Sequence, residues 1–140
     1  MEKEKDKIEY EKQLNSIRLN KIIELNNWWG LHYPGQKGTI ITANKEVYEY
    51  QFFNHIVPKY LEGKEVNYIV KTKTLTDKEY KKLINFLEKD LLLKETGIYH
   101  IHDASYKVDA KITKYGIHKV SYNDIDLYKY VEKFIKELIK

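Results

Sequence analysis

The chain has 140 residues, and its 25 lysines and arginines outnumber its 21 aspartates and glutamates. A chain of this length can bury about two thirds of its unfolded surface, so we expect a single domain over residues 1–140. It contains no cysteine, which excludes a disulfide framework and a thiolate metal centre. The charged start lacks the apolar stretch of a signal peptide, and no apolar run reaches the ~20 residues of a membrane span. We therefore expect a cytoplasmic protein without a membrane partner.

The positive charge comes almost entirely from lysine, since Arg18 is the only arginine. Arginine provides the two-pronged recognition of guanine and phosphate, so its scarcity disfavours base-specific binding of nucleic acid. Lysine still binds phosphate, and weak, non-specific nucleic-acid binding is expected. The abundance of lysine, isoleucine, asparagine and tyrosine is typical of AT-rich coding, which indicates a low-GC bacterium or one of its phages or plasmids.

The first part of the chain predicts one helix over residues 2–29. Its residues 1–12 form a charged, frayed start, and apolar residues then recur at roughly helical spacing. This stripe consists of Leu14, Ile17, Ile22, Leu25 and Trp28. Gly30 is expected to end the helix, and residues 30–38 to form a loop.

Three strands are predicted next. Residues 39–43 and 46–53 are rich in strand-forming residues and flank Asn44 and Lys45, which predicts a hairpin. A third strand is expected over residues 66–74. Its inward-facing residues are predicted to be Val66, Tyr68 and Val70.

The clearest local signal is a helix start at Thr76. The Thr76 hydroxyl can accept a hydrogen bond from the Glu79 amide, while the Glu79 carboxylate accepts one from the Thr76 amide. Leu75 and Tyr80 can pack together outside this capping box. A helix is therefore predicted over residues 77–92.

The last third of the chain predicts three more strands and a final helix. Strands are expected over residues 98–102 and 105–113, and a last one runs through Val120 or Tyr122. The resulting order, α-β-β-β-α-β-β-β-α, predicts an α+β domain. Its expected architecture is a mostly antiparallel sheet of about six strands, with three helices on one face.

Few residues of the sequence indicate a catalytic or cofactor-binding site. Residues 30–38 come close to a phosphate-binding loop, but Gln36 stands where the lysine should be and no helix follows. The serines lie in no nucleophile elbow, and the paired carboxylates have charged, solvated neighbours that would not raise their pKa. We therefore predict no catalytic residue and no cofactor, and we favour a non-enzymatic protein.

One pair of histidines has the spacing of metal ligands. His100 and His102 would lie on one face of a strand, and His118 or Asp109 could supply further ligands. The alternative is a chance pair on a half-exposed strand. His100 and His102 are kept as candidate ligands of a metal or of a small molecule.

Aromatic residues concentrate near the end of the first predicted helix. Helical periodicity places Trp28 in the core, and it turns Trp29 about 100° away. Together with His32 and Tyr33, Trp29 is a candidate partner-binding residue, because exposed aromatics are frequent at interfaces. Alternatively, the whole group folds over the sheet end as core.

The sequence favours a small protein that binds a macromolecular partner, most simply another protein, and a homo-oligomer is also compatible with it. An inhibitor or immunity-type factor of a phage or other mobile element fits this description. The second hypothesis is a nucleic-acid-binding module that uses lysines for the backbone and tyrosines for stacking. Its lysines would be Lys107, Lys111 and Lys119, although Asp109 interrupts their row.

Overall fold

The structure is a computed structural model of the chain. It describes residues 2–29, 35–53, 67–91, 104–112, 118–122 and 125–140. Within these ranges the chain forms three α-helices, one π-helical turn and six strands. In chain order they are α1 (Glu2–Arg18), β1 (Lys21–Trp29), β2 (Gly35–Thr42), β3 (Glu46–Phe53), β4 (Tyr68–Thr74), α2 (Asp77–Phe86), η2 (Leu87–Leu91), β5 (Ala104–Ile112), β6 (His118–Tyr122) and α3 (Ile125–Leu138).

All six strands belong to one antiparallel sheet, in the order β4-β3-β2-β1-β5-β6. The α+β class and the six-stranded sheet with three helices are thereby confirmed. The order along the chain is different, because four strands precede α2 and two follow it. The strand predicted over residues 98–102 lies outside the described residues.

The helix predicted over residues 2–29 is wrong in its second half. The helix ends at Arg18, and a turn at Leu19 and Asn20 leads into β1. Residues 22–26 are all buried, because β1 lies inside the sheet and is covered on both faces. Ile22, Leu25 and Trp28 also fit helical spacing, and this match outweighed the alternation of Glu24 and Asn26 with apolar residues, which explains the error.

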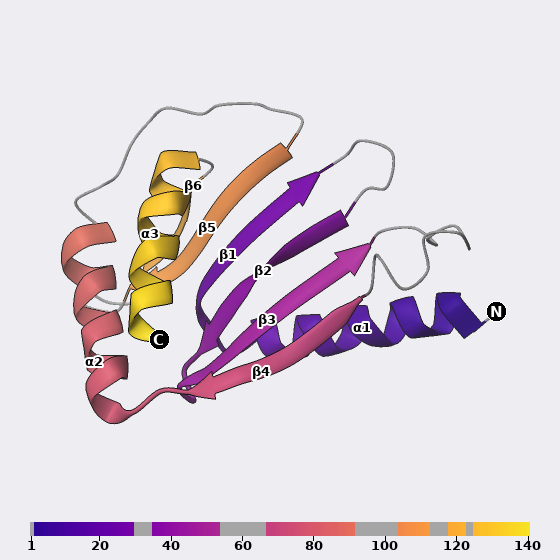
Figure 1. Ribbon diagram of the computed structural model, residues 1–140, viewed down its shortest axis with the longest axis horizontal. Coiled ribbons are helices and arrows are strands. Elements are labelled where there is room, and N and C mark those ends of the chain that lie inside the picture. Colours follow the sequence, from indigo (N-terminus) through magenta and orange to yellow (C-terminus); the bar gives the residue numbers. More distant parts are fainter. Residues whose placement is uncertain (1, 30–34, 54–66, 92–103, 113–117, 123–124) are drawn as a thin grey trace.

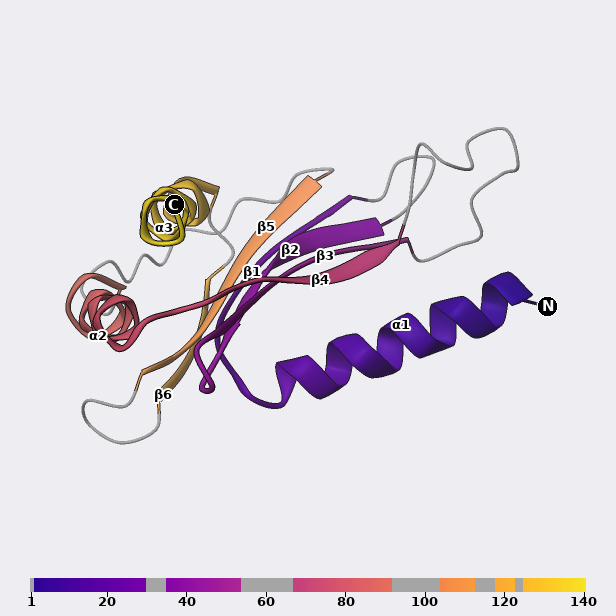
Figure 2. The same cartoon turned by 60° about the horizontal axis from the view of Figure 1, so that its bottom comes forward.

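The helices lie on both faces of the sheet, and not on one face as predicted. Figure 2 shows α1 on one side and α2 with α3 on the other. The main core lies between the sheet and α2 with α3, where Ile23, Val108, Leu83 and Val131 have no exposed surface. Full burial of such a side chain contributes about 1.5–3 kcal/mol.

The side covered by α1, called here the α1 side, holds a smaller apolar cluster. Leu14 of α1 is buried against Ile40 and Tyr50, with Ile17 and Ile69 packed beside them. The attachment of α1 to the sheet therefore uses the C-terminal part of this helix.

The predicted hairpin is confirmed, with Lys45 at the turn in the left-handed region (φ 68°). The prediction of which β4 side chains face the core is wrong. Tyr68 and Val70 are 37% and 48% exposed, whereas Ile69 packs against the α1-side cluster. In Figure 1, α2 and α3 cover the other half of the sheet and leave β4 clear. Val66, the third residue predicted to face inward, lies outside the described residues.

The capping box of α2 is confirmed. The Glu79 amide donates to the Thr76 hydroxyl over 3.1 Å, and the Thr76 amide donates to the Glu79 carboxylate over 2.9 Å. Lys73 holds the same carboxylate at 2.6 Å. The helix continues into η2, where the predicted helix was expected to reach residue 92.

The final helix presents an apolar stripe to the core. Its buried residues are Leu127, Tyr128, Val131, Ile135 and Leu138. Phe134 is partly buried and stacks on Phe86 of α2, with ring centroids 3.9 Å apart. None of the described helices is both long and apolar enough to span a bilayer.

Replacing Thr76 by alanine removes the hydroxyl that accepts from the Glu79 amide. The free energy of unfolding should fall by about 0.5–2 kcal/mol, measured by urea denaturation. Thr76→Ser keeps the oxygen and serves as the matched control, with an expected change of a few tenths. Equal midpoints for the two variants would show that the cap adds no stability.

Candidate functional site

Most of the residues singled out from the sequence cannot be placed in a site. His32, Tyr33, His100 and His102 lie outside the described residues. Trp29 is the last residue of β1, where its backbone pairs with Gly35 and Ala104. In the described ranges, no group of three or more histidines, cysteines, aspartates or glutamates could hold a metal ion.

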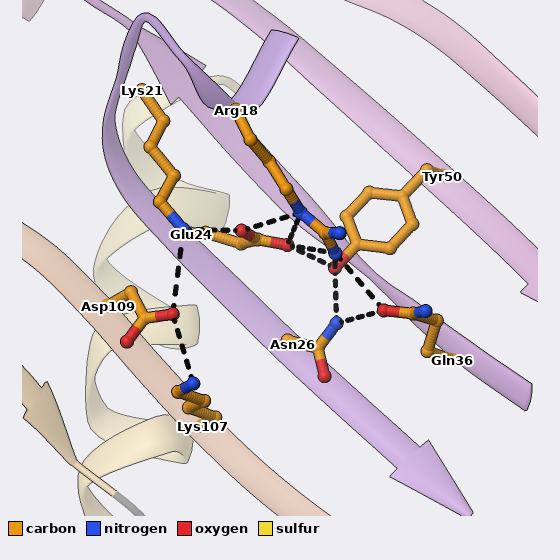
Figure 3. Close-up of polar contacts among 8 residues, drawn as sticks. All are labelled: Arg18, Lys21, Glu24, Asn26, Gln36, Tyr50, Lys107 and Asp109. Carbon is orange, nitrogen blue, oxygen red and sulfur yellow. Dashed lines mark hydrogen bonds and ion pairs between the residues drawn. The ribbon is translucent and has the colours of Figure 1, made fainter. Parts of the chain in front are cut away.

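The structure instead gathers polar side chains on the α1 side of the sheet (Figure 3). They come from the end of α1, from the central strand β1, from its neighbours β2 and β5, and from β3. This polar cluster consists of Arg18, Lys21, Glu24, Asn26, Gln36, Tyr50, Lys107 and Asp109.

Strand register explains why these residues meet. Alternate residues of β1 point to the same face, so Glu24 and Asn26 both lie on the α1 side. On β5, Asp109 is opposite Glu24 and Lys107 is opposite Asn26. Arg18 is added by the last turn of α1, which ends just before β1 begins.

Glu24 is the centre of the cluster and is only 2% exposed. Arg18 donates to its carboxylate from Nε at 3.0 and 3.1 Å and from Nη2 at 2.8 Å. Lys21 donates from Nζ at 2.8 Å, and the Tyr50 hydroxyl donates at 2.5 Å. Two cations and a hydroxyl therefore compensate the cost of burying this charge.

A second row of hydrogen bonds extends the cluster toward β2. Asn26 Nδ2 donates to the Tyr50 hydroxyl at 2.5 Å and to Gln36 Oε1 at 2.8 Å. Gly38 leaves the space for the Tyr50 ring, because a Cβ at this position would lie 2.8 Å from the Tyr50 hydroxyl and 1.9 Å from the Leu25 carbonyl oxygen. The cluster thus depends on a glycine in β2.

The surroundings of Glu24 and Tyr50 determine their protonation states at neutral pH. Burial alone would raise the pKa of Glu24, but the hydrogen bonds and charge of Arg18, with the bonds from Lys21 and Tyr50, lower it below its ordinary value. Burial and the neighbouring Glu24 charge raise the pKa of Tyr50. Glu24 is therefore a weak proton acceptor, and Tyr50 stays protonated.

An open depression of about 330 Å³ lies beside the cluster. All members of the cluster except Tyr50 line it, and Trp28 completes its wall. Trp28 was expected in the core as part of a helical stripe. It lies instead on β1, partly buried, on the α1 side.

The sequence held two signals for this site. Arg18 is the only arginine, and Glu24 and Asn26 alternate inside an otherwise apolar segment. Alternate residues share a face only in a strand, so this signal could not be recognised while the segment was predicted to be helical. Gln36 and Tyr50 come from strands whose register cannot be known from their own residues.

A second exposed surface follows the edge strand β4. Tyr68 and Val70 lie opposite Gln51 and Glu49 of β3, on the face away from α1. Among the described residues, no strand pairs with the outer edge of β4. We call this surface the β4 edge.

Comparisons with protein-family models, curated proteins and solved structures find no match for this chain. Its function therefore has to be inferred from the polar cluster and the β4 edge.

Glu24→Gln removes the charge that Arg18 and Lys21 share. At pH 7 the free energy of unfolding should fall by about 3 kcal/mol, because a partly buried arginine loses its counter-ion. The pKa of Glu24 is lowered on folding, so wild type loses this contribution as the pH falls below about 4.5 and through the folded pKa. The difference between the two proteins should therefore shrink below that pH.

The measurement is chemical denaturation at a series of pH values. Glu49→Gln, on the opposite face of the sheet, is the matched control and should change stability by less than about 0.5 kcal/mol. A difference between wild type and Glu24→Gln that stays constant down to pH 3 would contradict the role given to the Glu24 charge.

Proposed function

We propose that this protein is a binding module that takes up an extended segment of another protein along the β4 edge. The observation that carries the proposal is an edge strand of seven residues with two large exposed side chains. Such an edge is a template for pairing with a further strand.

Backbone geometry favours a protein as the partner. A seven-residue strand spans ~23 Å, and β4 presents alternate N–H and C=O groups along it, interrupted at Thr72 by the register shift in its pairing with β3. Only another polypeptide offers donors and acceptors at the matching spacing, so the main chain can supply affinity. Specificity would come from side chains, with Tyr68 and Val70 as the anchors on the exposed face.

Lysines on β4 favour a partner of different sequence. In an antiparallel pair of two β4 strands, Lys71 of one copy would lie opposite or diagonal to Lys71 of the other, which is unfavourable for like charges. An acidic residue of the added segment would meet Lys71 with the opposite charge, whereas Lys73 is already paired with Glu79. Binding of this kind suits an inhibitor or immunity-type factor, and we keep a phage or other mobile element as its proposed source.

Tyr68→Thr combined with Val70→Thr should reduce partner binding at least tenfold, because both anchors are lost while strand-forming residues are kept. The measurement is affinity purification from the native host, with quantitative mass spectrometry and nuclease treatment. Tyr130→Thr makes the same change at a tyrosine of α3 that is 41% exposed and is the matched control. Equal recovery with the double variant would contradict the proposal.

Strand addition has its own signature. With the purified partner, hydrogen exchange of the β4 amides should slow on binding, since pairing protects them from solvent. Binding without added protection of β4 would place the interface elsewhere.

A nucleic-acid-binding module is the second candidate. Lys107 and Lys111 lie on the α1 side of β5, and register places Lys119 opposite Lys111. Trp28 lies on the same face and could stack on a base. Asp109 lies between Lys107 and Lys111 on this face and interrupts the row of positive charges, which weakens this candidate.

For this candidate we expect only non-specific affinity, with a Kd of about 10⁻⁴ to 10⁻⁶ M at physiological salt. Fluorescence anisotropy with single-stranded DNA and RNA over a salt series measures it. Changing Lys107, Lys111 and Lys119 together to glutamine should have little more effect than the same change at Lys129, Lys133 and Lys136. Submicromolar binding lost only in the first triple variant would favour nucleic acid over a protein partner.

A further inference from the structure

We propose that the depression beside the polar cluster is a binding site for an oxyanion, a carboxylate or a phosphate group. This site is separate from the proposed β4 edge, because it lies over β1 and β5 on the opposite face of the sheet. Either proposal can fail without the other.

The charge balance of the lining residues is positive. Arg18, Lys21 and Lys107 contribute three positive charges, and Glu24 with Asp109 contributes two negative ones. Asp109 is held by Lys21 at 3.5 Å and by Lys107 at 3.6 Å. Both carboxylates are therefore already paired, and one positive charge remains for a ligand.

Several hydrogen-bond donors of the depression have no partner among the described residues. Arg18 binds through Nε and Nη2, and its Nη1 has no partner among the described residues. Gln36 accepts from two donors through Oε1, which fixes its amide orientation and leaves Nε2 unpartnered within the same described set. The longer contact of Lys107 with Asp109 leaves its ammonium able to donate to a ligand. An acceptor-rich anion fits these groups.

The donors are positioned before a ligand arrives. Glu24 is buried beneath Arg18 and holds its guanidinium through three hydrogen bonds, so little side-chain freedom is left to lose on binding. Trp28 adds a flat apolar wall and an indole N–H. The volume exceeds that of a single oxyanion and leaves room for part of the molecule that carries it.

The test is a titration of ¹⁵N-labelled protein with inorganic phosphate and, separately, with acetate, against chloride at equal ionic strength. The side-chain signals of Arg18 Nε–H, Gln36 Nε2 and Trp28 Nε1–H should shift in a saturable way. A tighter Kd for phosphate would identify a phosphate monoester as the natural group, and an equal or tighter Kd for acetate would identify a carboxylate.

Gln36→Glu places a carboxylate in the depression and should weaken binding at least tenfold. Lys107→Gln should weaken it about threefold, as expected for a partly exposed charge. Lys37→Gln removes the same charge from the neighbouring residue on the opposite face and is the matched control, with an unchanged Kd. Backbone spectra verify that each variant is folded.

Two results would overturn the proposal. One is the absence of saturable shifts up to about 100 mM of either anion, and the other is an equal Kd for wild type, Gln36→Glu and Lys107→Gln.

Discussion

The buried ion pair between Glu24 and Arg18 joins helix α1 to the sheet. The helix α1 has few apolar residues facing the sheet, namely Leu14 and Ile17, so its position depends strongly on this ion pair. The same contact orients Tyr50, Asn26 and Gln36 on three strands. A charge with 2% exposure is costly without partners, and its compensation requires α1, β1 and β3 to be in place together.

The two faces of the sheet carry different kinds of surface. The face covered by α2 and α3 is apolar and buried beneath these helices. It becomes exposed to solvent toward β4, at Tyr68 and Val70. The α1 side is polar over β1 and β5 and presents fixed charges around Trp28. The proposed recognition of a protein segment at the β4 edge and the proposed recognition of an anion would therefore use opposite faces of one sheet.

Much of the fold could be predicted from signals between neighbouring residues. The features that depend on contacts between remote parts of the chain could not. The cap at Thr76 involves four consecutive residues, and the turn at Lys45 joins adjacent strands, so both could be recognised from neighbouring residues. The central strand could not, because Ile22, Leu25 and Trp28 also fit helical spacing and the alternating polar residues Glu24 and Asn26 are buried rather than exposed. The candidate site combines Glu24 with Arg18, Tyr50 and Lys107, and only the register of remote strands reveals that combination. Tyr68 and Val70 are exposed because α2 and α3 do not extend over β4 (Figure 1). The alternation of residues within a strand carries no information about which part of the sheet a helix covers.

The position of α3 after all six strands has a consequence for how the chain folds during synthesis. Strands β1 to β4 form a run of neighbours from residues 21–74 and can pair while the ribosome is still translating the rest. The apolar face of Ile23 and Leu25 stays uncovered until β5 has paired with β1 and the last turns of α3, with Val131 and Ile135, have left the exit tunnel. The main core is therefore expected to close only after α3 has been synthesised, and a chain that lacks α3 would keep an exposed hydrophobic face that is prone to aggregate.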